Sequence, residues 1–160
     1  TSSNALFLEA ITKCKYDAVL LDMAPSLDAL HTCGLIASNW VFLPTRMDSL
    51  SVDGLQEVIR NLGEFSRRGH ILEGYCILPT FFDRNTRETY LQFHKLTETF
   101  GGHLWPPIPQ DTRIREAPAF GNTLWEYAPN CLAMKGFPEG RKRIGGYRQI
   151  LKKFMEVLDA

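Results

Sequence analysis

No stretch of this 160-residue sequence approaches the roughly 20 consecutive apolar residues that a membrane-spanning helix requires. The N-terminus also lacks the charged and then apolar layout of a signal peptide. Because 18 basic residues balance 18 acidic ones, the composition favours neither a nucleic-acid binder nor an acidic solvating protein. The four cysteines form no CxxC pair and no Cys/His cluster at metal-ligand spacing. These absences predict a cytoplasmic protein with reduced thiols.

Two phosphate-binding motifs are missing as well. The sequence contains neither the GxxxxGK(S/T) loop nor the GxGxxG turn, whose backbone N–H groups hold phosphates. These residues alone therefore do not predict a complete triphosphate site. The chain also begins inside an expected helix, and we expect that sequence upstream of it is missing.

The pattern along the chain predicts a three-layer α/β fold with a mainly parallel sheet, because short apolar runs alternate with amphipathic stretches. A hydrophobic content of 44% suffices for one core, and we expect residues 1–160 to form a single domain. Strands are expected at 18–21, 40–43, 72–78 and 104–108, with a last short strand at 123–127. Helices are expected at 3–14, 27–37, 51–65, 86–100 and 147–158, and an irregular connection at 128–146.

The stretch YDAVLLDMAP, residues 16–25, holds the first candidate for a functional residue. Its apolar run at 18–21 stops at Asp22, and a bounded run of this kind suits a strand buried on both faces. Ligands of open parallel sheets bind at the carboxyl ends of the strands, so this carboxylate is a candidate to hold a metal or orient a water. The alternative is an acid that ends a strand and caps the following turn.

Polar loops also follow the expected third and fourth strands, at 83–87 and 110–115. Carboxyl ends of parallel strands share one edge of the sheet, so these loops and Asp22 are expected to frame one crevice. Residues 135–160 carry seven basic and three acidic residues, a local net charge of +4. Their cations could bind phosphates, and the alternative is an ordinary solvated surface. The cations of this cluster are Arg141, Lys142, Arg143, Arg148, Lys152 and Lys153.

Four motifs, in order, resemble those of the ParA-type partition ATPases, the ParA/Soj/MinD superfamily with a deviant Walker A loop. They are YDAVLLDMAPSL, VFLPTRMDSLSVDGL, ILPTFFDRNTRET and IPQDTRIREAPAFG. The resemblance covers residues 3–158 and identifies the chain as a C-terminal portion that lacks the P-loop. It implies a P-loop NTPase-like, Rossmann-like fold whose N-terminal part, with switch I, is absent.

The resemblance also implies a function in plasmid or chromosome partition, or in positioning another cargo. A complete relative would bind ATP and Mg²⁺, form a homodimer through ATP, bind DNA without sequence specificity and hydrolyse ATP when stimulated. Its partner would be a ParB-like or other centromere or cargo-adaptor protein. It would be located in the cytoplasm, on the nucleoid and not at a membrane. Because the P-loop is absent, this chain alone is expected to be inactive. The alternatives are a MinD-like membrane-associated ATPase and a non-enzymatic interaction module that retains the fold.

Site residues follow from the same resemblance. Asp22 would be the switch II acid, catalytic and contacting Mg²⁺ through water. The adenine would lie against Thr80, Pro109, Gln110 and Asp111. The resemblance implies that four loop arginines contribute to DNA binding or to the dimer face: Arg84, Arg87, Arg113 and Arg115. The basic cluster adds three DNA-binding candidates: Arg143, Arg148 and Lys152. For Arg113 and Arg115 the alternative is a solvated loop whose charges pair locally.

Overall fold

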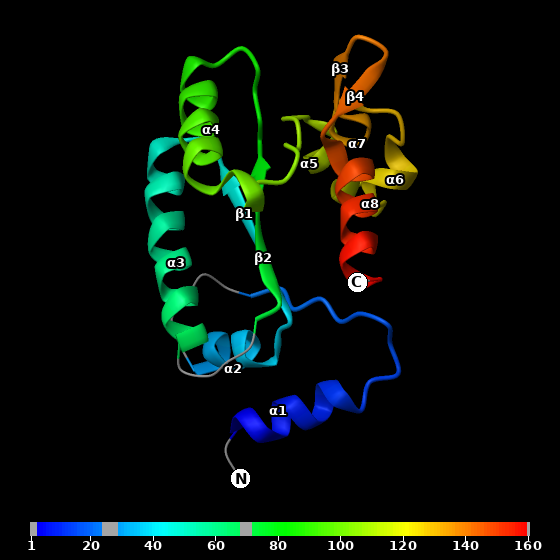
Figure 1. Ribbon diagram of the computed structural model, residues 1–160. Helices are drawn as coiled ribbons and strands as arrows, with labels where there is room; N and C mark the ends of the chain where they lie inside the picture. Colours follow the sequence, from blue (N-terminus) through cyan, green and yellow to red (C-terminus); the bar gives the residue numbers. More distant parts are fainter. Residues whose placement is uncertain (1–2, 24–28, 68–71, 160) are drawn as a thin grey trace. The chain divides into compact units, whose positions relative to one another are not determined.

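The computed structural model describes residues 3–23, 29–67 and 72–159, and helices flank a parallel sheet in it (Figure 1). The predicted α/β fold is therefore confirmed. In chain order the elements are α1 (Ser3–Thr12), α2 (Ala29–Ala37), β1 (Trp40–Arg46), α3 (Ser49–Arg67), β2 (Gly74–Thr80), α4 (Arg87–Phe100), the 3₁₀ turn η1 (Gly101–His103), α5 (Arg113–Ala119), α6 (Leu124–Tyr127), α7 (Leu132–Lys135), β3 (Phe137–Glu139), β4 (Lys142–Ile144) and α8 (Gly146–Leu158).

The sheet is built on β1 and β2, which are hydrogen-bonded neighbours in the sheet and are connected along the chain by α3. A second neighbour of β2 is the segment 104–109, where parallel bridges join Ile77 to Leu104 and Phe82 to Pro109. The expected fourth strand is thus reduced to isolated bridges. Three of the six residues in this segment are prolines, which have no N–H to donate to a ladder.

The strand expected at 18–21 is wrong for the described structure. Residues 18–23 have no regular secondary structure, and Val19 and Leu20 are 42% and 76% exposed. A buried strand needs a hydrogen-bonded neighbour on each side, and in the part of the chain that the structure describes no strand pairs with this segment. An apolar run alone therefore did not determine a strand here.

The strand expected at 123–127 is wrong as well, because Leu124–Tyr127 forms the helix α6. The Thr123 hydroxyl accepts a hydrogen bond from the Glu126 N–H at 3.3 Å, and the Glu126 carboxylate accepts one from the Thr123 N–H at 2.9 Å. This reciprocal capping box starts a helix in spite of the aromatic residues that suggested a strand. The expected irregular connection at 128–146 in fact contains α7 and the β3–β4 hairpin.

The chain forms two compact units. Unit 1 comprises residues 1–41 and 62–75, and α1 and α2 contact each other within it. Unit 2 comprises residues 42–61 and 76–160. The expectation of one domain for residues 1–160 stays a prediction. Among the described helices, none is both long and apolar enough to cross a membrane.

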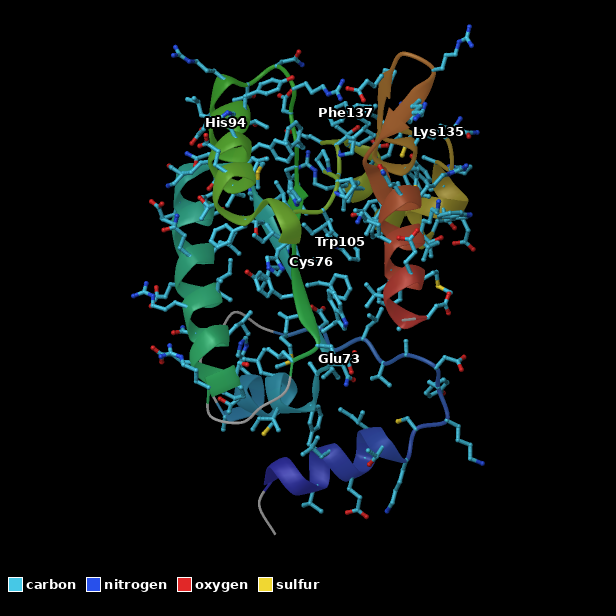
Figure 2. The ribbon with its side chains drawn as sticks, viewed as in Figure 1. Glu73, Cys76, His94, Trp105, Lys135 and Phe137 are labelled. Carbon is cyan, nitrogen blue, oxygen red and sulfur yellow. The ribbon has the colours of Figure 1, made fainter. Side chains whose placement is uncertain are left out.

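The core of unit 2 lies around the carboxyl half of β2. Ile77 of β2 and Leu96 of α4 are fully buried there. Trp105, labelled in Figure 2, meets the Phe42 ring edge to face at 5.3 Å. A second cluster joins Ile108 to Met134 of α7, with residues of α8 packed against it. These two clusters hold the segment 104–111 between β2 and the C-terminal helices.

Candidate functional site

The carboxyl end of β2 is joined to the segment 104–111 by main-chain hydrogen bonds. The bonds run, donor to acceptor, from Trp105 N to Ile77 O (2.9 Å), Ile108 N to Pro79 O (2.8 Å), Phe82 N to Ile108 O (3.0 Å) and Gln110 N to Phe82 O (3.0 Å). Prolines interrupt the ladder but do not prevent it, because every bond uses a residue that retains its N–H. The loop after β2 and the loop after residue 108 are therefore neighbours.

Three of the four candidate adenine contacts lie at this junction. Thr80 is the last residue of β2 and is half-buried, Pro109 is fully buried, and Gln110 is exposed. The family resemblance assigned them to one base, and the hydrogen bonds show that the loops that carry them are neighbours. Their role in binding a base stays a prediction.

The fourth candidate, Asp111, has a carboxylate that is already occupied by donors within the chain. Its Oδ1 accepts from the Arg113 N–H at 3.1 Å and from Arg113 Nη1 at 3.2 Å, and its Oδ2 accepts from the Ala133 N–H at 3.2 Å. The side chain is only 3% exposed. The N-cap residues Thr112 and Cys131 make no side-chain cap bond, and Asp111 instead caps α5 and α7 by accepting one N–H from the first turn of each.

The charge state of Asp111 follows from these bonds. Burial of the carboxylate works against its ionisation, yet the hydrogen bonds from Ala133, Arg113 and Cys131 together hold the pKa of Asp111 below its ordinary value. Sequence reasoning missed Ala133 and Cys131 as partners, because 22 residues separate Asp111 from Ala133 and no local pattern links them. A carboxylate held in this way is poorly placed to read a base directly, whereas the exposed amide of Gln110 is free to reach outward.

Phe81, which directly follows Thr80, is a second feature that the sequence did not reveal. It has a φ of 50°, in the left-handed region that bulky residues rarely adopt, and its ring is 46% exposed. The Arg46 guanidinium at the end of β1 lies 5.0 Å from the ring centre. Arg46 also forms an ion pair with Asp48 at 3.3 Å. Strained backbone and an exposed aromatic ring at the carboxyl edge of a sheet are typical of functional sites.

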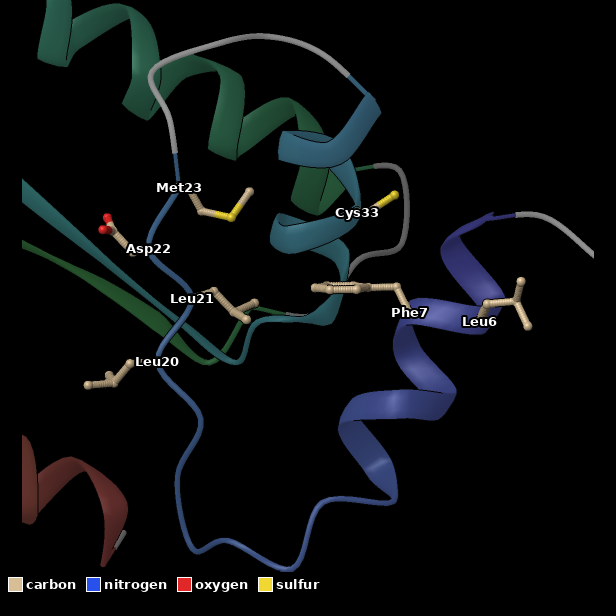
Figure 3. A pocket seen from close by; sticks show the side chains of 7 residues that line it. All are labelled: Leu6, Phe7, Leu20, Leu21, Asp22, Met23 and Cys33. Carbon is tan, nitrogen blue, oxygen red and sulfur yellow. The ribbon is translucent and has the colours of Figure 1, made fainter.

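Asp22 lies in unit 1, on the extended segment that leads toward α2. Figure 3 shows Leu21 and Met23 on one side of the main chain and Leu20 and Asp22 on the other, which is the alternation of a β-strand without its pairing. The segment borders a hollow of about 600 Å³, and of the described residues lining it Asp22 alone is charged. Met23 packs against Gly34 of α2, where a Cβ on the glycine would collide with the methionine side chain.

The donor set around Asp22 bears on the expected magnesium site. In the described part of the chain, no group of three or more His, Cys, Asp or Glu side chains could hold a metal ion. Asp22, whose side chain is exposed, thus offers a single carboxylate. Mg²⁺ usually keeps several waters and takes only one or two carboxylates together with substrate phosphates. One exposed carboxylate therefore fits a water-mediated contact, and it does not fit a dedicated all-protein metal site.

The candidate DNA-binding residues divide into two sets. Arg84 donates to the Pro138 carbonyl at 3.5 Å, Arg143 to the Gly136 carbonyl at 2.8 Å and Arg148 to the Pro129 carbonyl at 2.9 Å. Arg113 is tied to Asp111, so the local pairing weighed for it is present. The remaining candidates are exposed and form no ion pair with another described residue; they are Arg87, Arg115 and Lys152.

Comparisons with known proteins point to one family. A family model described as an AAA domain, AAA_31, matches residues 3–72. The chain is 34% identical over 124 residues to the chromosome-partitioning ATPase Soj of Thermus thermophilus, which covers 76% of this chain and 49% of that protein. It is 28% identical over 135 residues to the chromosome partitioning protein ParA of Caulobacter vibrioides, covering 81% of this chain and 50% of that protein. The chain thus spans about half the length of these curated relatives.

Solved structures of Cyanothece McdA share the fold. The apo structure aligns with a TM-score of 0.54 and 14% identity over 61% of this chain and 41% of McdA. An ATP complex of an McdA variant gives the same TM-score and identity over 60% of this chain and 39% of McdA.

Proposed function

Because this chain belongs to the ParA-type partition ATPase family, we propose that the complete protein acts in chromosome or plasmid partition, or in positioning another cargo. It uses ATP and Mg²⁺ to form a homodimer that binds DNA without sequence specificity. A ParB-like or other cargo-adaptor protein is the proposed partner, and the nucleoid is the proposed location. Residues 1–160 contribute a single domain with the adenine-facing segments and Asp22.

The observation that carries the proposal is the junction between β2 and the segment 108–110. The hydrogen bond of 3.0 Å from the Gln110 N–H to the Phe82 carbonyl joins two loops at the carboxyl edge of the sheet. That edge is where parallel α/β sheets bind nucleotides. Thr80 lies two residues before Phe82, and Pro109 directly precedes Gln110. The junction therefore supports a role for these loops in holding a base.

The chain's own candidate residues have separate proposed roles. Gln110 presents an exposed amide to the base, and Asp111 fixes the main chain that follows it by capping α5 and α7. The carboxylate of Asp22 would be the group that holds Mg²⁺ through water or orients the attacking water. When bound, Mg²⁺ neutralises charge on the phosphates and so lowers the barrier to phosphoryl transfer.

The catalytic role of Asp22 is tested by Asp22→Asn in the full-length protein. Hydrolysis of ATP should fall by about 100-fold or more, because a carboxylate that positions water or a proton typically contributes at least that factor. Asp17→Asn is the matched control, since Asp17 is an exposed acid on the same extended segment. Equal hydrolysis rates for the two variants would remove Asp22 from the mechanism.

The partition role is tested by duplex binding. The ATP-loaded full-length protein should bind DNA of unrelated sequences with similar affinity, and log K should fall linearly with log salt. An adaptor encoded beside it should raise the hydrolysis rate in the presence of that DNA. If the ATP-loaded protein shows no salt-dependent duplex binding, the partition function is wrong even though the fold stands.

One observation favours the MinD-like alternative. The helix α8 exposes a stripe of Leu151, Met155 and Leu158, which are 47%, 48% and 42% exposed, and Lys152 lies beside it. An amphipathic helix with basic flanks can lie in the interface of an anionic membrane. Sedimentation with vesicles containing anionic lipid separates the two functions, because the partition protein should stay in the supernatant.

A further inference from the structure

The β3–β4 hairpin carries a short basic arm, which we define as Glu139–Arg143. The register pairs Glu139 with Lys142 and Pro138 with Arg143, which leaves Gly140 and Arg141 as a two-residue turn. Gly140 has a φ of 57°, and glycine with positive φ at the first turn position is the pattern of type II′ hairpins. A Cβ built on Gly140 would meet no other atom within 4 Å. The tip of the arm therefore stands in open space.

The base of the arm is fixed. Phe137 is 6% exposed, and its ring meets that of Phe82 at 5.8 Å. The Arg84 guanidinium covers the Phe137 ring at 4.1 Å from its centre. Beside Phe137, a Cβ on Gly136 would collide with the backbone of Ile144 and Gly145, so the two segments of the chain pack closely at the base of the hairpin. Figure 2 labels Phe137 at the foot of the hairpin.

The cations of this region differ in what already binds them. Arg84 and Arg143 donate to main-chain carbonyls of the hairpin itself and so maintain its shape. Arg141 and Lys142 are exposed, and in the described part of the chain neither forms an ion pair or a side-chain hydrogen bond. The register places Glu139 opposite Lys142, but no ion pair joins them or Arg141 to another described residue, so both cations can contact an external anion.

The geometry points to the arm as a contact for the phosphate backbone of duplex DNA, made by Arg141 and Lys142. This inference rests on the proposed function and adds a site to it. Two cations on a narrow, fixed tip suit phosphates, and such contacts carry no sequence information. The tip residues Glu139, Gly140, Arg141 and Lys142 include no apolar side chain to insert into lipid, which disfavours a membrane as the partner.

The experiment compares three forms of the ATP-loaded full-length protein on one duplex over a salt series. They are the unchanged protein, the double variant Arg141→Gln with Lys142→Gln, and a control with the same charge loss on α3 and α4, Arg60→Gln with Lys95→Gln. Losing two phosphate contacts should make the slope of log K against log salt shallower by about 1.8 and weaken binding about 60-fold at ~0.1 M salt. The control should keep the slope of the unchanged protein.

Further variants and probes complete the test. Arg141→Lys keeps the charge and should keep the slope, and urea unfolding of the double variant should match that of the unchanged protein. If the double variant keeps the slope of log K against log salt, the arm does not contact DNA, while the proposed partition function stands. Absence of duplex binding by the unchanged protein overturns both. If the unchanged protein binds anionic vesicles and the double variant loses this binding but still binds duplex DNA, the partner of the arm is not DNA.

Discussion

Replacing Asp111 tests the role that the structure gives it. In Asp111→Ala, the N–H groups of Ala133 and Arg113 lose their acceptor, and both α5 and α7 lose a cap. Ala133 is fully buried, and in the described structure its N–H donates to the Asp111 carboxylate. A buried unsatisfied donor costs about 1–3 kcal/mol, and a lost cap costs about 0.5–2 kcal/mol. The guanidinium of Arg113 is half exposed and adds little.

We therefore expect Asp111→Ala to lower the free energy of unfolding by about 2–4 kcal/mol in urea titrations of the full-length protein. Asp111→Asn keeps one acceptor oxygen and should lose about half as much. The matched control is Asp53→Ala, whose carboxylate is 69% exposed and pairs with Lys95 at 3.4 Å. A surface pair of this kind contributes about 0–1 kcal/mol. If Asp111→Ala and Asp53→Ala are equally stable, the capping argument is wrong.

The pH dependence gives an independent check. The folded-state pKa of Asp111 is lowered from its ordinary value of 3.8, so the folded state favours the charged carboxylate. Its stabilisation is then fully present above about pH 5 and is lost as the pH falls through the folded pKa. The stability difference between the unchanged protein and Asp111→Asn should stay constant from pH 8 to about 5 and shrink in more acidic buffer. A difference that grows on acidification would contradict the assignment.

Two other predictions concern single residues. Phe81→Gly should change the unfolding free energy by no more than about 1 kcal/mol, because glycine relieves the strained φ of 50°. Phe82→Ala, at a buried ring, should cost about 3–5 kcal/mol, and similar losses for both would refute strain at Phe81. Burial raises the pKa of the Cys76 thiol to about 12, so iodoacetamide at pH 8 should modify exposed Cys14 and spare Cys76 in the folded protein. Peptide mapping by mass spectrometry measures the labelling of each cysteine, and equal labelling of Cys14 and Cys76 would contradict the prediction.

Local patterns sufficed for the elements whose cause is local. The helices α3 and α4 and the strands β1 and β2 lie within a few residues of the expected bounds, although the Thr86 side chain expected to cap α4 forms no cap hydrogen bond. The apolar run at 18–21 wrongly predicted a strand, because a strand also needs a hydrogen-bonded neighbour and the described structure has none beside this segment. Local patterns also could not reveal the partner of Asp111, because Ala133 is 22 residues away. Thr80 and Gln110 were placed together from sequence by the resemblance to the ParA-type family, and the shared carboxyl edge of parallel strands is consistent with that placement.

The candidate residues of unit 2 and of unit 1 differ in how firmly the main chain around them is held. The loops around Phe82 and Gln110 are joined by main-chain hydrogen bonds over a buried core, so their geometry exists before any ligand arrives. Asp22 lies on a segment that has the alternation of a strand and, among the described residues, no strand beside it. No main-chain ladder with another described strand restrains residues 18–22. Amides at 18–22 should consequently exchange with deuterium far faster than those at 76–78, and binding of ATP should slow exchange at 18–22 most.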